Sequence, residues 1–517
     1  MRSSQRLVLN TAVTYTRSLV GAGLALFSSR WVLNGLGQVD YGLFSLVGSI
    51  LVFIAFLNSV MASSASRHFA YYIGQGDSTE VNRWFNAAFS IHLCIAVALT
   101  LAGWGIGDYL ILRVFNIPQV RIAVCQQVFH ISLVSLFTGM LSIPFVAMFR
   151  AKQCIAELSL WDMLHSALNF VLAYYLMQAA DDRLIFYAAG MTAILVVYHS
   201  GQMFRAAFGF QECAFVFRQW FDKKRVTEIF SFAFWNLIGS LGATLRDQGS
   251  AILLNLYFGP KVNAAYGIAK QVSTQTGQLA GAMLGAFSPE ITSREGRGDR
   301  SGMLDLALRA SKFGTLLVLI FLVPLMMEME YVLRLWLVAP PLYTAPLCRL
   351  ILCMFLIDRL STGYMLAINA HGKIAGYQAT LGTTLVLTLP LAWLLLHLGC
   401  EPPSVGVAFI FTMAGCSFGR VLWARYLLKA PIRRWVTTVV IPCGIVGVLS
   451  TVAASLPWYF FESNFSRLVL VTGGSLVVYS VSTWFIALDQ SERVFLGQNM
   501  QRLVQKMGFF HSTSPKE

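Results

Sequence analysis

The chain has 517 residues, of which 56% are hydrophobic and 12% charged, and its formal net charge is +14. Soluble domains contain about 45–50% apolar and about 25% charged residues, so the composition excludes an ordinary soluble protein. A mean hydropathy of +0.64 and apolar runs of about 20 residues instead predict a polytopic membrane protein. The nine cysteines are scattered without a Cys-x-x-Cys pair, so we expect no disulfide framework, no metal site and no cofactor.

Apolar windows taken in chain order predict about fourteen membrane-spanning helices. Their approximate ranges are 8–30, 42–62, 86–107, 122–147, 156–178, 185–207, 229–257, 264–287, 305–329, 345–368, 376–398, 404–427, 436–456 and 466–488. The loops expected outside are too small for a periplasmic catalytic domain. The fold class that this pattern predicts is an all-α polytopic membrane protein.

A repeated motif falls in the loops of this series. Gly74-Gln75-Gly76-Asp77 and Gly296-Arg297-Gly298-Asp299 each follow an apolar span, and Gly76 and Gly298 lie 298 − 76 = 222 positions apart. The links after the first and the seventh span, around Gly37 and Gly259, are also alike. Because an even number of spans separates the repeats, both halves enter the membrane in the same direction.

The repeat predicts how the chain is divided. We expect one six-helix bundle in 1–215 and a second in 216–430, related by a pseudo-two-fold axis along the membrane normal. Two additional transmembrane helices should occupy 431–490, and a basic cytoplasmic tail should follow in 491–517.

Basic residues predict the orientation in the membrane. When alternate loops are assigned to opposite sides, Lys and Arg collect on one of them, as at Arg67, Arg150, Lys224 and Arg297. Cytoplasmic loops are enriched in Lys and Arg, so both termini should be cytoplasmic. This topology also accounts for the positive net charge, which argues against a nucleic-acid partner.

Polar residues inside several spans mark faces turned away from lipid. In the first span Asn10, Thr14, Arg17 and Gly21 share one side. Arg17 lies about 15 Å along this span, near the bilayer centre, where an arginine costs at least about 2.5–3.5 kcal/mol. Comparable positions in the seventh and eighth spans are Asn236, Ser240, Arg246, Asp247, Lys270, Gln271, Thr274 and Gln278.

These cations have few acids to pair with inside the membrane. Asp247 adjoins Arg246, but neighbouring helix residues point about 100° apart, so we do not expect the two side chains to face each other. Asp162 and Asp358 are the main other interior acids, and Asp358 adjoins Arg359. We therefore predict a cavity of positive potential for an anionic cargo, since arginine binds phosphate through paired hydrogen bonds. A pump for cationic drugs would show buried carboxylates instead.

Several phrases of the sequence match a family pattern. They are Ser29-Arg30-Trp31-Val32-Leu33-Asn34, Leu36-Gly37, Asp40-Tyr41-Gly42, Phe56-Leu57-Asn58, Gly74-Gln75-Gly76-Asp77, Phe234-Trp235-Asn236, Arg246-Asp247-Gln248-Gly249, Leu254-Asn255, Phe258-Gly259-Pro260 and Asn263-Ala264-Ala265-Tyr266-Gly267-Ile268-Ala269. Over about residues 1–430 the chain resembles the polysaccharide transporter (oligosaccharide flippase, Wzx-type) family. That family belongs to the multidrug/oligosaccharidyl-lipid/polysaccharide exporter (MOP) superfamily.

The resemblance implies a V-shaped pair of six-helix bundles that alternates between inward-open and outward-open forms. It implies a non-enzyme that moves a polyprenyl-diphosphate-linked oligosaccharide, such as an O-antigen repeat unit, to the outer leaflet of the bacterial inner membrane. Membrane lipids and the polysaccharide polymerase machinery are the further partners it suggests. It places cationic contacts for the diphosphate at Arg17, Arg246, Lys270 and Arg30. The polar stripes add Gln271 and Asn236 as substrate contacts and Asp247 as a candidate for ion coupling.

Other functions fit parts of the pattern. A drug or metabolite antiporter and a flippase for the peptidoglycan precursor would share the fold. For Arg30, near the outer end of its span, snorkelling to the interface is an alternative to substrate binding. A membrane-embedded glycosyl- or acyltransferase would need a catalytic pair, and Asp162 and His165 stand at helical spacing. A buried polar pair more often only forms hydrogen bonds, so we favour transport.

Overall fold

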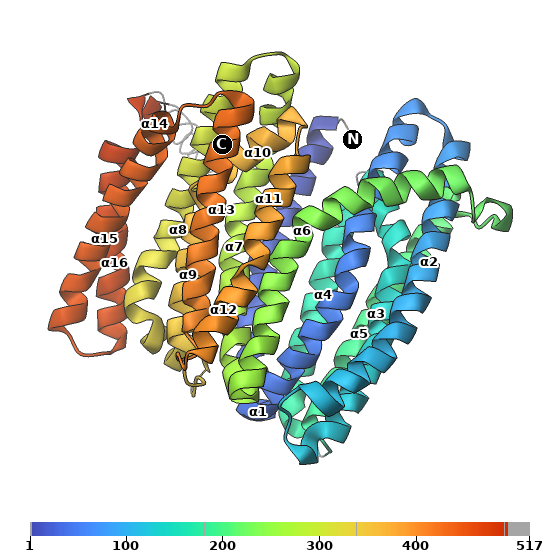
Figure 1. Ribbon diagram of the computed structural model, residues 1–517, viewed down its shortest axis with the longest axis horizontal. Coiled ribbons are helices and arrows are strands. Elements are labelled where there is room, and N and C mark those ends of the chain that lie inside the picture. The colour runs from blue at the N-terminus through green and yellow to red at the C-terminus, as the bar shows by residue number, and fades with distance from the viewer. Residues whose placement is uncertain (1–2, 153, 180, 338, 491, 495–517) are drawn as a thin grey trace, which may run out of the picture. The chain divides into compact units, whose positions relative to one another are not determined.

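The computed structural model describes the backbone of residues 3–152, 154–179, 181–337, 339–490 and 492–494. At some helical positions, Arg17 and Asn236 among them, the side chain lies outside the described part. The described residues are mostly helical and contain no strand (Figure 1). The predicted all-α class is confirmed.

The α-helices follow one another along the chain with short connections. They are α1 (Ser3–Gln75), α2 (Ser78–Tyr109), α3 (Ile122–Ala151), α4 (Ile155–Tyr175), α5 (Arg183–Gly209), α6 (Lys223–Phe258), α7 (Pro260–Gly296), α8 (Arg300–Leu337), α9 (Thr344–Arg359), α10 (Thr362–His371), α11 (Ala375–Val386), α12 (Thr388–His397), α13 (Ser404–Leu428), α14 (Ile432–Trp435), α15 (Ile441–Phe460) and α16 (Phe465–Ser482). Each predicted span falls on one of these helices, on one arm of α1, or on two consecutive helices.

Within the described residues, 9 helices are long and apolar enough to cross a membrane, or up to 10 when α9 and α10, which are bent by 45°, count as one span. The chain is therefore a multi-pass membrane protein. Over their described residues, α4, α6 and α7 are not among these helices, and α6 and α7 carry charged residues in their middle, at Arg246, Asp247 and Lys270.

The first helix consists of two arms that meet at Gly37. This residue has φ 75° and ψ 170°, a conformation that suits glycine because it lacks a Cβ. Gly259, 222 positions later, has φ 77° and separates α6 from α7. The same backbone conformation thus occurs at the two glycines that the sequence repeat pairs.

The two copies of the Gly-x-Gly-Asp motif have the same hydrogen-bonded turn. Gly76 has φ 75°, and its N–H donates to the Ile73 carbonyl at 3.1 Å. Gly298 has φ 78°, and its N–H donates to the Glu295 carbonyl at 3.0 Å. A left-handed glycine of this kind satisfies carbonyls at the end of a helix. The repeated motif in the sequence thus marks a repeated helix end.

The aspartate of each motif begins the next helix. Asp77 accepts a hydrogen bond from the Glu80 N–H, and Asp299 accepts one from the Gly302 N–H, both at 2.9 Å. Each carboxylate satisfies a donor that the first turn of a helix leaves unpaired. The motif therefore ends one helix and caps the start of the next.

The chain forms two compact units. The first comprises residues 1–282, 333–355 and 373–419, and the second comprises the remainder. Their boundaries pass through α7, α8, α9 and α13, so they follow packing rather than the repeat. The division at residues 215 and 430 remains a prediction.

In the first unit, α3 packs along α5, and α1 packs against α3, α4 and α6. Fully buried side chains at this core include Leu43, Leu46, Phe129 and Leu133. Apolar burial of this kind fixes α1 beside α4 and α5. These helices, together with α6 and α7, carry the candidate site.

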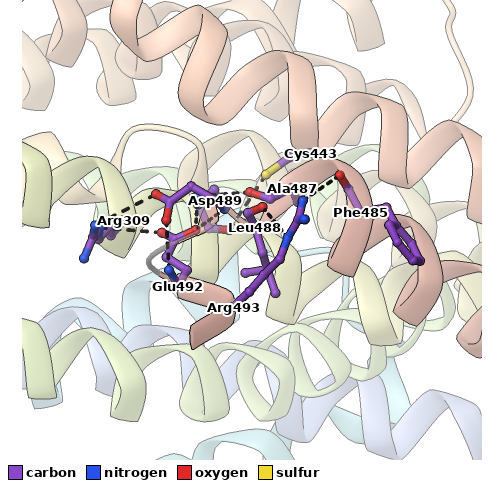
Figure 2. Close-up of polar contacts among 9 residues, drawn as sticks. Arg309, Cys443, Phe485, Ala487, Leu488, Asp489, Glu492 and Arg493 are labelled. Carbon is purple, nitrogen blue, oxygen red and sulfur yellow. Dashed lines mark hydrogen bonds and ion pairs between the residues drawn. The ribbon is translucent and has the colours of Figure 1, made fainter. Parts of the chain in front are cut away.

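In the second unit, α15 and α16 lie side by side (Figure 1). The segment after α16 folds back so that Asp489 and Glu492 point toward Arg309 of α8 (Figure 2). The Sγ of Cys443 in α15 lies 3.8 Å from the carbonyl oxygen of Lys312 in α8. The last helical pair is thus joined to α8 by polar as well as apolar contacts.

Candidate functional site

A charged cluster lies between α6 and α7 in the first unit. The Nε of Arg246 donates to Oδ1 of Asp247 at 2.8 Å, and the Nζ of Lys270 donates to Oδ2 of the same carboxylate. The hydroxyl of Tyr266 donates to the Asp247 carbonyl at 2.9 Å. Two cations share one carboxylate, so the cluster of Arg246, Asp247 and Lys270 carries one net positive charge. We call these three residues the charge triad.

The contact between Arg246 and Asp247 corrects an expectation from the sequence. We expected the two side chains not to face each other, and this was wrong. The angle of about 100° applies where side chains leave the helix. The long arginine side chain has enough rotatable bonds to bring its guanidinium round to the neighbouring carboxylate. Arg246 and Lys270 therefore share one acid partner. The two cations and the single carboxylate together keep a net charge of +1.

The two cations of the triad differ in exposure. The side chain of Arg246 is 9% exposed and lies over the ring of Phe409 in α13, 5.3 Å from the ring centroid. A cation at this distance is attracted to an aromatic face. The side chain of Lys270 is 30% exposed. Arg246 is thus held in place, and Lys270 is the member within reach of a ligand.

The remaining predicted contacts lie on α1, α6 and α7. The Nε2 of Gln271 donates to Oγ of Ser29 at 2.8 Å and to the Ala25 carbonyl at 3.0 Å, which ties α7 to α1. Arg30 follows Ser29 and is half-buried, with no ion pair to a described residue. The predictions for the side chains of Arg17 and Asn236 lie outside the described residues.

A cavity of about 330 Å³ lies among α1, α4, α5 and α7. Gln271 lines it, and Lys270 is the preceding residue on α7. From α4 it is lined by His165, Ser166 and Asn169. The sequence analysis did not assign Ser166 or Asn169, although polar residues three and four apart on α4 were a signal of a polar face.

A second, larger cavity of about 710 Å³ lies among α1, α3 and α5. Its lining is mostly apolar, with side chains such as Leu51, Met140 and Leu195. Its polar lining residues are Ser132, Ser135, Ser142, Arg150, Tyr198, His199 and Gln202. The two cavities of the first unit thus differ in chemistry.

The pair raised as a catalytic candidate has other partners. Asp162 accepts a hydrogen bond from the Tyr198 hydroxyl at 2.5 Å, and Nε2 of His165 lies 3.0 Å from Nδ2 of Asn169. General acid–base catalysis needs a group within reach of a reacting atom and a partner that orients it. The Asp162–Tyr198 bond ties α4 to α5, and the His165–Asn169 contact lies within α4, so neither residue of the pair orients the other.

The second unit holds a further cluster of the same composition. Arg420 donates to Oδ1 of Asp358 at 2.7 Å, and a nitrogen of Arg359 lies 3.1 Å from the same carboxylate. Asp247 and Asp358, the two acids considered above for a neighbouring arginine, therefore each have two cationic neighbours. The side chain of Arg420 is 8% exposed, which marks this cluster as an interior contact.

Comparison with known proteins identifies the fold. No protein-family model matches the chain. The uncharacterized membrane protein EpsK of Bacillus subtilis strain 168 is 22% identical over 322 residues, which are 60% of this chain and 62% of EpsK. The match thus spans less than two thirds of that relative.

Two solved structures are similar over most of the chain. An inward-facing multidrug resistance MATE family transporter of the MOP superfamily has a TM-score of 0.70 at 14% identity, covering 81% of this chain and 98% of that one. The lipid II flippase MurJ in an inward closed conformation has a TM-score of 0.66 at 12% identity, covering 92% and 98%. The chain has the fold of MOP-superfamily transporters, and these neighbours are transporters rather than enzymes.

Proposed function

We propose that this protein is a flippase for a polyprenyl-diphosphate-linked oligosaccharide, the repeat unit of a surface polysaccharide such as O-antigen. The observation that carries the proposal is the charge triad. Its excess positive charge lies within helices of a transporter fold, and the partly exposed Lys270 belongs to it. An interior cation of this kind is suited to a phosphate group.

The triad supplies a way to bind and release an anion. Lys270 would contact the diphosphate while Asp247 stays paired with Arg246. Protonation of Asp247 would remove one negative charge and leave two uncompensated cations, which strengthens anion binding. Asp247 could thereby couple proton movement to the affinity for substrate. We include Arg17 and Arg30 in the same binding region on the strength of their positions in the first span.

The transport cycle we propose is alternating access without bond formation. The headgroup would be received from the cytoplasmic side of the inner membrane, with the polyprenyl chain left in lipid. The bundles would then rearrange so that the site faces outward, where the polysaccharide polymerase machinery takes the product. Cytoplasmic termini, as the distribution of basic loops predicts, belong to this proposal.

A flipping assay with the purified protein in liposomes tests the proposal. The probe is a fluorescent undecaprenyl-diphosphate oligosaccharide, and the readout is the fraction quenched from outside with time. A charge-assisted hydrogen bond contributes about 1.5–3 kcal/mol, so Lys270→Gln should slow flipping about ten- to hundredfold. Lys261→Gln, an exposed position on the same helix, is the matched control and should flip at the wild-type rate. Equal rates in both variants would reject the proposal.

Two rival substrates are tested in the same liposomes. Similarity to MurJ favours lipid II as an alternative cargo, and similarity to a multidrug transporter favours a cationic drug. We expect the polysaccharide precursor to move faster than lipid II. Accumulation of a fluorescent cationic drug against its gradient, with no flipping of either lipid, would instead favour the antiporter.

A further inference from the structure

We propose that the 330 Å³ cavity among α1, α4, α5 and α7 is a glycan subsite that takes one neutral sugar ring of the cargo. This inference rests on the proposed function, because the sugar is the one linked to the diphosphate. The charge triad would hold the diphosphate, and the cavity would select the carbohydrate.

The described side chains of the lining favour an uncharged ligand in this cavity. Of the described residues that line it, none is a lysine, arginine, aspartate or glutamate, whereas four are serines: Ser28, Ser29, Ser45 and Ser166. Among these described residues a phosphate would find no cation, and a cationic group would find no carboxylate. The ligand that suits such a wall is uncharged and rich in hydroxyl groups.

The size of the cavity favours a compact ligand. Small-molecule sites commonly have volumes of about 300–1,000 Å³, and this cavity lies at the lower end of that range. A single sugar ring fits such a volume, whereas an acyl or prenyl chain needs a long apolar channel. The larger cavity among α1, α3 and α5 also has hydroxyl groups in its lining, at Ser132, Ser135 and Ser142, but its wall includes the charged Arg150 and is apolar over most of its area.

Two polar groups at the cavity have unused hydrogen-bonding capacity. Tyr187 of α5 is only 9% exposed, and its hydroxyl has no hydrogen bond to a described residue. The Oδ1 of Asn169 is buried and likewise has no partner there, although Nδ2 of the same amide lies 3.0 Å from Nε2 of His165. Buried polar groups are nearly always hydrogen-bonded, so these two are available to a ligand. Together they supply one donor and one strong acceptor.

Aromatic rings complete the wall. Tyr41, Phe44 and Tyr187 line the cavity, and the rings of Phe44 and Tyr187 meet edge to face with centroids 5.0 Å apart. A sugar ring has hydroxyls at its edge and C–H groups on its faces. It therefore matches a wall that combines polar groups with aromatic surface.

The cavity is placed so that a sugar there could remain attached to a diphosphate at the triad. Gln271 lines the cavity and follows Lys270 directly on α7. Its amide is fixed by Ser29 and Ala25 of α1, so this part of the wall is rigid. One helix therefore presents a cation and, one residue later, the cavity wall.

Binding of defined lipids to the purified full-length protein in nanodiscs tests the inference. The probes are undecaprenyl diphosphate and the same lipid carrying glucose, galactose, N-acetylglucosamine or galacturonic acid. A net hydrogen bond contributes about 0.5–1.5 kcal/mol, so a few of them should give the best neutral glycolipid about a tenfold or greater advantage over the sugar-free lipid. The galacturonic acid lipid should show no such advantage.

Tyr187→Phe removes only the unpaired hydroxyl. We expect it to reduce the advantage of the best glycolipid by about two- to tenfold. The affinity for undecaprenyl diphosphate itself should not change. Asn169→Leu, which removes the acceptor, is the second variant and should act in the same direction. Tyr174→Phe, at an exposed position of α4, should keep the wild-type advantage.

The possible outcomes separate this inference from the proposed function. If wild-type protein binds sugar-free and neutral sugar-bearing lipids equally, the subsite is rejected while the diphosphate site stands. An equal loss of affinity for every lipid in Tyr187→Phe would also reject the subsite. If the galacturonic acid lipid binds as tightly as the galactose lipid, selection for neutral sugars is rejected. If no diphosphate lipid binds at all, the proposed function fails together with the subsite.

Discussion

Lys312 of α8 and Glu492, which follows α16, form an ion pair that is buried on both sides. Their side chains are each 3% exposed, and Nζ of the lysine lies 2.5 Å from Oε2 of the glutamate. Nζ also donates to the Ala487 carbonyl at 3.0 Å. The end of the last helical segment is thereby attached to the interior of the second unit.

We predict that Lys312→Met strongly destabilises the protein. It leaves the carboxylate of Glu492 buried without its closest cation, and loss of one partner of a buried pair costs about 3–5 kcal/mol. The double variant Lys312→Met with Glu492→Leu removes both charges and should recover most of the loss. The measurement is the thermal unfolding midpoint in detergent.

The control for this prediction is Arg309→Ala. Arg309 is 42% exposed and lies 3.6 Å from Oε1 of the same glutamate. An exposed pair contributes about 0–1 kcal/mol, so its loss should barely change the midpoint. A double variant as unstable as Lys312→Met alone would show that lost packing, rather than an unpaired charge, explains the effect.

We predict that Gly76→Ala destabilises the turn between α1 and α2. At φ 75° an L-residue is strained by about 1–2 kcal/mol, and Gly298→Ala should have a similar effect because its φ is 78°. Gly105 of α2 is helical with open space at its Cβ position, so Gly105→Ala should be neutral or stabilising. Equal midpoints for the Gly76 and Gly105 variants would contradict the role assigned to the motif.

The helices could be predicted from the sequence because a chain that crosses a membrane forms long apolar helices. These helices give a clear hydropathy signal. It also found the repeat, since only glycine suits the backbone at Gly37, Gly76, Gly259 and Gly298. These features depend on local sequence. They are therefore readable without the tertiary structure.

The site was only partly predictable for a physical reason. The choice of Arg246, Asp247 and Lys270 could be made from their cost in lipid, but their pairing depends on how α6 packs against α7. The cavity at Tyr187 and Asn169 was missed, since its walls come from four helices and each residue is ordinary on its own helix. Side-chain reach and helix packing are the information that a linear pattern lacks.

We predict a loss of stability at low pH that depends on Asp182. Burial acts to raise the pKa of this carboxyl, but hydrogen bonds from Arg121 and from the Ile185 and Leu184 N–H groups outweigh it, so the pKa is lowered from 3.8. A group with a lowered folded-state pKa adds stability above its unfolded pKa. That stability is lost as the pH falls through the folded-state pKa.

Asp182→Asn tests this pH dependence and keeps the capacity to cap α5. The variant should unfold at a lower temperature than wild type at pH 7. Its midpoint should approach that of wild type as the pH falls below about 4, where the carboxyl begins to protonate. Asp181→Asn changes an exposed neighbour, and its unfolding midpoint should equal that of wild type at every pH. A constant difference between Asp182→Asn and wild type would exclude titration of this group as the cause.

We predict that net charge at the triad sets the affinity for undecaprenyl diphosphate. Wild type has two cations and one carboxylate, so Asp247→Asn raises the net charge to two and Lys270→Gln lowers it to zero. The double variant restores a net charge of one. The affinity should therefore rise at least about tenfold in Asp247→Asn, fall in Lys270→Gln, and return toward wild type in the double variant. Higher salt should reduce the differences in affinity between the variants and wild type, because mobile ions screen the charge of the partly exposed Lys270. Affinities that fall equally in both single variants would show that the geometry of the cluster, and not its charge, governs binding.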